Sequence, residues 1–203
     1  MRVIAGSAGG IRLSVPKRGV RPTMDRVKAA IFSSLGDAII GARVLDLFAG
    51  SGALGIEALS RGASSVLFVE EDRQSTDVIE KNLAKTRFEA RVRQQSVFDF
   101  LRSASGTEKF QIVFADPPYE KTQSGERFTE MLLTSEKLSG LLAPGGVFVL
   151  EKRPGEGLSE TKLWRVDRQK KYGATEVLFL SAATAGPTRT NPQGVHPPRR
   201  AIE

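Results

Sequence analysis

Residues that often carry catalysis are scarce in this chain of 203 residues. It has no cysteine, which excludes disulfides, a thiol nucleophile and cysteine-ligated metal sites. Its single histidine, His196, lies in a proline-rich tail, which argues against a histidine triad or a histidine metal centre. No apolar run is long enough to span a membrane, and the N-terminal apolar stretch is too short for a signal peptide. We therefore expect a cytoplasmic protein without a metal cofactor.

Positive charge, by contrast, is in excess. Thirty Lys and Arg residues against 23 Asp and Glu residues give a formal net charge of +7. This balance favours a polyanionic partner but does not require one. The length and an apolar content of 40% fit one globular domain with a real core and small additional segments.

The two ends of the chain differ from its middle. Residues 1–40 are expected to form an N-terminal extension, with a small hairpin around Gly6–Gly10 and a helix capped by Thr23 and ended by Gly36. Residues 183–203 are rich in Pro, Ala, Thr and Gly and lack periodicity, so a disordered tail is expected there.

Between these ends, apolar segments typical of strands alternate with amphipathic segments typical of helices. The pattern over residues 41–182 predicts an α/β fold with a mostly parallel sheet and helices on both faces. One helical segment is expected over residues 125–142, and an antiparallel hairpin that closes the sheet over residues 162–182. In such sheets ligands bind beyond the carboxyl ends of the strands.

A glycine-rich loop follows the first strand of this region. Gly50, Gly52 and Gly55 have the G-x-G-x-x-G spacing between a strand and a helix, the context of a nucleotide-binding loop. Glu70, twenty residues after Gly50 at the end of the next strand, is placed to accept hydrogen bonds from ribose hydroxyls. A tight turn without a ligand is the alternative, and the position of Glu70 favours ligand binding.

The residue before this loop bears on which nucleoside binds. Asp46 lies four residues before Gly50, where a carboxylate would repel the pyrophosphate of a dinucleotide. It suits a cation such as the amino group or the sulfonium of S-adenosylmethionine. Asp46 can instead cap the helix or accept hydrogen bonds from the loop backbone, so NAD remains open at this point.

A second unusual stretch, Asp116-Pro117-Pro118-Tyr119, ends the fourth strand. An amine attached to an aromatic base is a poor nucleophile because its lone pair is delocalised into the ring. The Asp116 carboxylate and the Pro117 carbonyl can accept its two N–H groups, and the prolines fix the backbone and have no N–H of their own. Tyr119 offers a ring on which a flipped-out base can stack. A proline-terminated turn with a buried tyrosine is the alternative, but it gives no reason for a carboxylate to face the crevice.

Four segments, which occur in this order along the chain, carry a family resemblance: "RPTMDRVKAAIFSSL", "VLDLFAGSGALGIEALSRGA", "ADPPY" and "YGATEVLFL". They resemble the bacterial 16S ribosomal RNA guanine-N2 methyltransferases of the RsmD type, over roughly residues 1–182. The resemblance implies a class I S-adenosylmethionine-dependent methyltransferase fold, Rossmann-like, with a seven-stranded sheet whose last strand is antiparallel. It also implies methyl transfer to N2 of one guanine in 16S rRNA, within a small ribosomal subunit or assembly intermediate, by a monomer.

The resemblance also implies roles for individual residues. The cofactor-binding residues would be Asp46, Phe48, Ala49, Gly50, Ser51, Gly52, Glu70, Glu71, Ser96, Val97 and Asp116. Catalysis would rest on Asp116, Pro117 and Tyr119, and substrate binding on Arg21, Thr23, Arg26, Pro118 and Tyr119. The family often has an acid or amide near the adenine amine, where this chain has Ser96 with Asp99 one turn later, so that contact stays open. For Arg21, Thr23 and Arg26, a capped, salt-bridged helix start is an equal alternative.

Three functions from different classes remain. The first is the rRNA guanine-N2 methyltransferase. The second is a methyltransferase of another amine, such as adenine N6 in a nucleic acid or a glutamine side chain in a protein. The third is a NAD-dependent oxidoreductase or a nucleotide-binding module without activity, which only the glycine spacing supports. Asp46 and the Asp116–Tyr119 stretch argue against the third.

Overall fold

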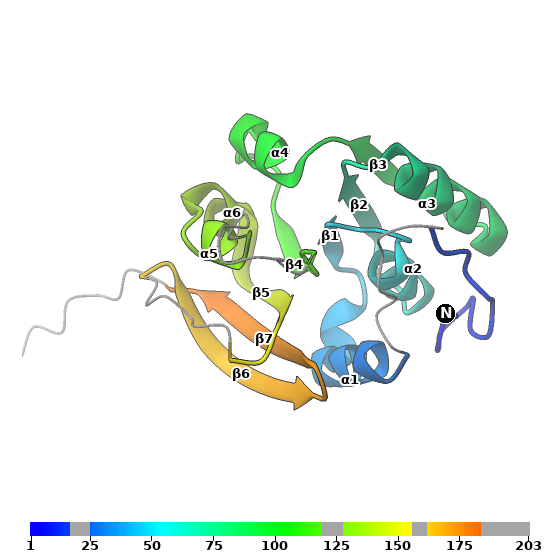
Figure 1. Cartoon of the computed structure of the whole chain (residues 1–203), viewed down its shortest axis with the longest axis horizontal. Coiled ribbons are helices and arrows are strands. Elements are labelled where there is room, and N and C mark those ends of the chain that lie inside the picture. The colour runs from blue at the N-terminus through cyan, green and yellow to red at the C-terminus, as the bar shows by residue number, and fades with distance from the viewer. Residues whose placement is uncertain (17–24, 119–127, 156–161, 184–203) are drawn as a thin grey trace, which may run out of the picture.

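The computed structural model of this chain describes residues 1–16, 25–118, 128–155 and 162–183. Its strands form one seven-stranded sheet (Figure 1). They are β1 (Arg43–Leu47), β2 (Ser65–Glu70), β3 (Arg91–Gln94), β4 (Phe110–Ala115), β5 (Leu142–Lys152), β6 (Trp164–Tyr172) and β7 (Thr175–Ala182).

The order of the strands across the sheet is β3-β2-β1-β4-β5-β7-β6. The pairs from β3 to β5 are all parallel, whereas β7 is antiparallel to both of its neighbours. The mostly parallel sheet and the closing hairpin predicted over residues 162–182 are confirmed. The strand order reverses between β1 and β4, so the loops that follow these two strands flank the position where sheets of this kind bind ligands.

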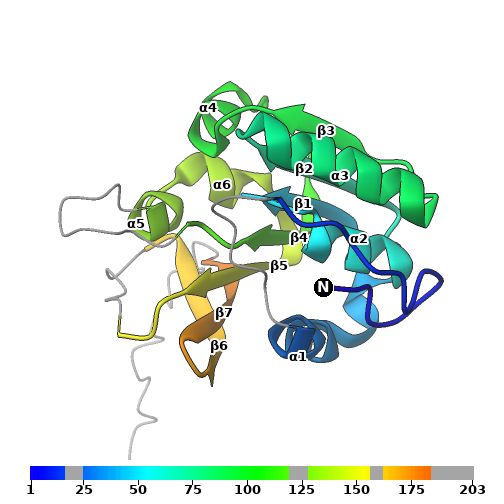
Figure 2. The ribbon, with the colours of Figure 1, turned by 45° about the vertical axis from the view of Figure 1, so that its right-hand side comes forward.

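Helices cover both faces of the sheet (Figures 1 and 2). They are α1 (Asp25–Leu35), the 3-10 helix η1 (Gly36–Ile39), α2 (Ala53–Ser60), α3 (Arg73–Thr86), α4 (Val97–Ser103), α5 (Phe128–Leu133) and α6 (Glu136–Leu141). Side chains of α1, α2 and α3 share one core cluster with the sheet, and side chains of α4, α5 and α6 share a second one. The sheet is therefore the middle of three layers.

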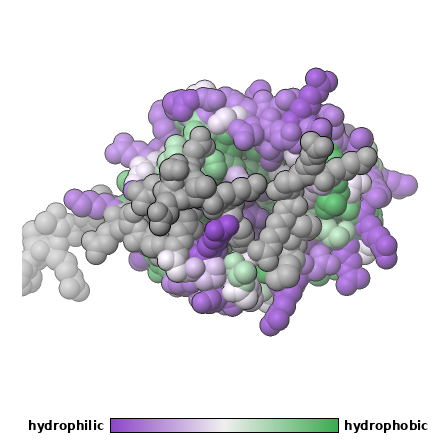
Figure 3. Space-filling view, viewed as in Figure 1, coloured by the Kyte–Doolittle hydropathy of each residue, from purple (hydrophilic) through white to green (hydrophobic). Residues whose placement is uncertain are grey.

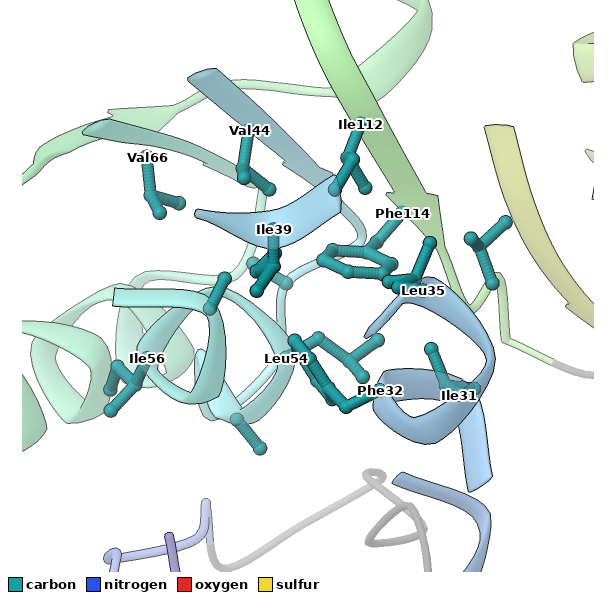
Figure 4. Close-up of a cluster of buried hydrophobic side chains, with 14 of the residues drawn as sticks. Ile31, Phe32, Leu35, Ile39, Val44, Leu54, Ile56, Val66, Ile112 and Phe114 are labelled. Carbon is teal, nitrogen blue, oxygen red and sulfur yellow. The ribbon is translucent and has the colours of Figure 1, made fainter. Parts of the chain in front are cut away.

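The apolar face of α1 packs into the first of these clusters (Figure 4). Ile31, Phe32 and Leu35 are buried at helical spacing, and the ring of Phe32 lies 5.6 Å from that of Phe114 on β4. Burying a side chain of this kind stabilises a fold by roughly 1.5–3 kcal/mol. The helix predicted for the N-terminal extension is thus present, and it is part of the sheet's core. The predicted cap, Thr23, lies outside the described residues.

The first sixteen residues form a hairpin-like loop that is held by the glutamate of α2. Val3 and Ile11 are joined by a backbone hydrogen bond, and a single antiparallel bridge links Arg2 and Arg12. The Glu57 carboxylate accepts hydrogen bonds from the backbone N–H groups of Ile4 and Ala5 at 2.7 and 3.1 Å. The chain thus turns back on itself at the position of the predicted hairpin, but without regular strands.

The prediction of one continuous helical segment over residues 125–142 was wrong about its continuity. Two short helices, α5 and α6, replace it within the described part of that range. The break has a local cause, because the Ser135 hydroxyl accepts a hydrogen bond from Leu138 N at 3.1 Å and so caps the start of α6. Of residues 183–203, where a disordered tail is predicted, only Ala183 is among the described residues, and its N–H donates to the Leu163 carbonyl at 2.8 Å.

Hydrophilic residues cover most of the coloured surface on the side drawn in Figure 3. Across the described segments, no helix has the length and apolar character needed to cross a membrane.

Candidate active site

The glycine loop joins β1 to α2 in a conformation that depends on two of its glycines. Gly52 has a φ of 74°, in the left-handed region that favours glycine. A Cβ on Gly55 would lie 2.3 Å from Cε1 of the buried Phe68, so only glycine lets α2 pack this closely on β2. The spacing G-x-G-x-x-G thus fixes a tight strand-to-helix turn and a close helix–sheet contact.

Asp46 lies at the base of this loop and is 2% exposed. Its Oδ2 accepts a hydrogen bond of 2.9 Å from Gly55 N in the first turn of α2, so the carboxylate does cap the loop and helix backbone. The pKa of Asp46 is raised to about 8. Burial is the main cause and the negative charges of Asp116 and Glu70 add to it, whereas the hydrogen bond from Gly55 N lowers the pKa. A cation bound beside Asp46 would relieve this electrostatic cost.

Glu70, the last residue of β2, also contacts the loop. Its Oε2 accepts a hydrogen bond from Gly50 N at 2.8 Å, and its Oε1 accepts one from Asp72 N at 2.9 Å. A carboxylate has about four acceptor positions, so two remain for ribose hydroxyls. Glu71, the next residue, is exposed.

The remaining loop residues hold the glycine loop against its surroundings. Ala49 N donates to the carbonyl of Val69 on β2 at 3.2 Å. The carbonyl of Ser51 accepts a hydrogen bond from Asn82 Nδ2 on α3 at 2.9 Å, and Asn82 also bonds both backbone groups of Ser14. The N-terminal segment and the predicted cofactor loop therefore share one buried anchor.

Asp116, Pro117 and Pro118 follow β4, beside the glycine loop that follows β1. Asp116 is half-buried, Pro117 is buried and Pro118 is exposed. The charge of Asp116 raises the pKa of Asp46, which shows that the two predicted parts of the site lie within electrostatic reach. Tyr119, predicted to stack on the target base, lies outside the described residues, as do Arg21 and Thr23.

Glu151, which the sequence analysis did not single out, lies beside the predicted site residues. It lies near the end of β5, next to Asp116, and is 3% exposed. Burial raises the pKa of its carboxyl, and the charges of Asp116 and Asp46 raise it further. The acidic residue within the apolar run "VFVLEK" was the available signal.

Three phenylalanines gather on the other side of the loop. Phe48, with a φ of 55°, lies 6.1 Å from Phe98 and 5.6 Å from Phe128, and the rings of Phe98 and Phe128 are stacked. A positive φ at a residue with a side chain costs of order 1–3 kcal/mol and is often found at functional sites. Of these three, only Phe48 was predicted to belong to the site.

The predicted contacts to the adenine lie at the start of α4. Ser96 is the residue that precedes this helix and Val97 is its first residue, one strand away from the end of β2. Asp99, the other candidate, is exposed and paired with Arg102. Arg26, predicted to bind substrate, is exposed in the first turn of α1.

The site as a whole suits a cationic nucleoside. Asp46, Glu70, Asp116 and Glu151 bring four carboxyl groups to the carboxyl ends of β1, β2, β4 and β5 in a chain of net charge +7. A dinucleotide pyrophosphate would be repelled there, whereas the ammonium and sulfonium of S-adenosylmethionine would be attracted. Within the ranges that the structure covers, no group of His, Cys, Asp and Glu could hold a metal ion.

Comparison with known proteins identifies the family of this chain. The profile of a family described as "Conserved hypothetical protein 95" matches residues 1–181. The chain belongs to this family. Ribosomal RNA small subunit methyltransferase D of Escherichia coli K12 is 39% identical to it over 176 residues, which are 85% of each chain. The resemblance to RsmD-type methyltransferases is thereby confirmed.

Solved structures share the fold. The Escherichia coli protein yhhF superposes with a TM-score of 0.76 at 36% identity, covering 90% of this chain and 97% of that one. The Thermus thermophilus 16S rRNA N2 G1207 methyltransferase RsmC, in complex with AdoMet and guanosine, superposes with a TM-score of 0.61 at 25% identity. The superposed region covers 80% of this chain and 43% of the RsmC chain. The class I methyltransferase fold expected from the motifs is confirmed.

Proposed function

We propose that this protein transfers a methyl group from S-adenosylmethionine to the exocyclic amine N2 of a guanine in 16S rRNA of the small ribosomal subunit. One observation carries the proposal: in a member of the RsmD family, Asp116 and Pro117 lie beside an acidic glycine loop at the reversal of strand order. The names of the curated relatives support rRNA as the substrate class.

The cofactor would be held at the carboxyl ends of β1, β2 and β3. Its ribose would meet Glu70, its cationic methionine end the carboxylates of Asp46 and Asp116, and its adenine the segment around Ser96 and Val97. When bound, S-adenosylmethionine supplies a methyl group that is already activated by the positive sulfur. The chain therefore needs to supply alignment and charge, and no strong base.

The target amine would be held by Asp116 and Pro117. Two acceptors on the two N–H groups fix the nitrogen and localise its lone pair toward the methyl group. As the bond between N2 and the methyl carbon forms, the bond from that carbon to sulfur would break and S-adenosylhomocysteine would leave. The positive charge that develops on N2 is stabilised by the carboxylate of Asp116, and it disappears when N2 loses one of its protons to solvent. Pro117 and Pro118 have no N–H groups, so these residues offer the base acceptors only.

The partner that we propose is the small ribosomal subunit or an assembly intermediate, recognised by a monomer in the cytoplasm. A net charge of +7 assists the approach to rRNA. Methylation of adenine N6 is a second candidate, because the same acceptor pair can hold that amine. The NAD-dependent alternative has lost its support, since the carboxyl cluster would repel a pyrophosphate.

The test is to incubate the protein and S-adenosylmethionine with small subunits from a strain that lacks this activity, and then to digest the rRNA and analyse its nucleosides by mass spectrometry. We expect N2-methylguanosine. Methylation of adenine, or of ribosomal protein alone, would overturn the proposal.

A further inference from the structure

Glu151 carries a buried oxygen that the fold does not use. Its Oε1 is shielded from solvent and has no hydrogen-bond partner among the described residues. A buried carboxyl oxygen without a partner is costly, and groups of this kind in native proteins call for an explanation. On the same strand, the buried Lys152 is paired with Glu176 at 2.8 Å.

The register of the sheet brings Glu151 to the target side of the site. β4 and β5 are parallel and pair Ala115 with Leu150, so the following residues, Asp116 and Glu151, lie side by side. Phe114 and Val149, two residues earlier on each strand, are also paired and belong to the core cluster of α1. Because side chains alternate along a strand, Asp116 and Glu151 project from this same face.

A guanine whose N2 is held by Asp116 and Pro117 presents two further groups on the same edge. N1–H, adjacent to N2, is a donor, and O6, beyond it, is an acceptor. An adenine held by its N6 presents an acceptor, N1, at the adjacent position. A side chain that offers an acceptor next to the amine therefore fits guanine and leaves two acceptors facing each other in the case of adenine.

We infer that Glu151 is a specificity-determining residue that accepts a hydrogen bond from N1–H of the target guanine and donates one to its O6. The inference rests on the proposed function, and it adds a residue that reads the base to those that hold its amine. The raised pKa of Glu151 favours the protonated carboxyl, which has the one acceptor and one donor that this pairing needs. It also avoids a second full negative charge beside Asp116.

Two variants of similar size separate hydrogen bonding from packing. Glu151→Gln keeps one acceptor and one donor, whereas Glu151→Met fills the space with neither. We expect Glu151→Gln to retain most of the activity on small subunits, and Glu151→Met to lower kcat/KM by about 10- to 100-fold, as for a lost base contact. Both variants should keep wild-type affinity for S-adenosylhomocysteine, measured by calorimetry, which also verifies that they fold. Glu108→Gln, at the opposite end of β4, serves as the control and should behave as wild type.

The outcomes distinguish the inference from the proposed function. If the wild type forms no N2-methylguanosine, the proposed function fails and the role of Glu151 fails with it. If the wild type forms N2-methylguanosine and both Glu151 variants are as active as the wild type, only the inference is overturned. Equal loss in both Glu151 variants would also overturn it, because an amide would then not replace the carboxyl.

Discussion

Asp46 and Gly55 are joined by a hydrogen bond of 2.9 Å that closes the glycine loop across nine positions of the chain. The bond fixes the loop from within, yet it ties up a carboxyl that is almost completely buried. The same side chain therefore shapes the loop and sits where its charged form is unfavourable, and a cationic ligand bound beside it would stabilise that charged form.

The stability of the protein should depend on pH through Asp46. The pKa of this group is about 8 in the folded protein, above its value in the unfolded chain, so its contribution to stability is complete at low pH and is lost as the pH rises toward 8. The slope approaches about 1.4 kcal/mol per pH unit between the two pKa values. We expect Asp46→Asn to remove this dependence, as measured by urea unfolding across the same pH range. Parallel curves for the two proteins would contradict the assignment.

Cofactor binding should release a proton near neutral pH. A cation placed beside Asp46 lowers the pKa of its carboxyl from about 8, so a carboxyl that is protonated in the free protein ionises in the complex. Calorimetry with S-adenosylhomocysteine in phosphate and in Tris buffer should give binding enthalpies that differ by the number of protons released times the difference between the ionisation enthalpies of the two buffers. In Asp46→Asn the difference should shrink. An equal difference in both proteins would assign the proton to another group.

The third glycine of the loop should be required for packing. In Gly55→Ala the new Cβ would lie 2.3 Å from Cε1 and 2.6 Å from Cζ of Phe68, a fully buried side chain. We expect a loss of about 1–3 kcal/mol in the free energy of unfolding, and more if the helix cannot shift. Gly140→Ala is the matched control, because that glycine lies in α6 with nothing within 4 Å of its new Cβ. It should leave stability unchanged or raise it by about 0.5–1 kcal/mol.

How far the sequence predicts this protein depends on the range of the interactions involved. The glycine loop, Glu70 and Asp116 were predictable because short segments determine them, and parallel strands bring their ends to one edge. Glu151 was missed because its burial comes from β4 and β7 on its two sides, and the acidic residue in the run "VFVLEK" does not show which strands those are. The stacking of Phe98 on Phe128 likewise joins distant segments. The break between α5 and α6 was a local signal, Ser135, that the longer helical pattern concealed.

The stability of the protein should depend on a buried ion pair at the N-terminal segment. Lys28 and Glu57 have no solvent exposure, and Nζ lies 3.1 Å from Oε2. Burial lowers the pKa of Lys28, and the charge of Glu57 opposes that shift. We expect Glu57→Gln to cost about 3–5 kcal/mol of unfolding free energy, because it leaves a buried ammonium without its counter-charge.

Two further variants test that explanation. Lys28→Met combined with Glu57→Gln should recover part of the loss, since no charge then remains buried. Asp99→Asn breaks an exposed pair with Arg102 and should cost less than about 1 kcal/mol. If the double variant is as unstable as the sum of the two single ones, the pair is not coupled.

Asp116 and Glu70 should separate catalysis from cofactor binding. Asp116 holds the amine in the proposed reaction and stabilises charge that develops on it, so Asp116→Ala should lower kcat by about 100-fold or more. Its affinity for S-adenosylhomocysteine should be nearly unchanged, because this product lacks the positive sulfur that the Asp116 carboxylate would face in S-adenosylmethionine. Glu70→Ala removes the acceptors of the ribose and the bond to Gly50 N, so it should weaken that affinity by about 10- to 100-fold. Calorimetry and initial rates on small subunits measure the two effects, and full turnover by Asp116→Ala would refute the role of its carboxylate.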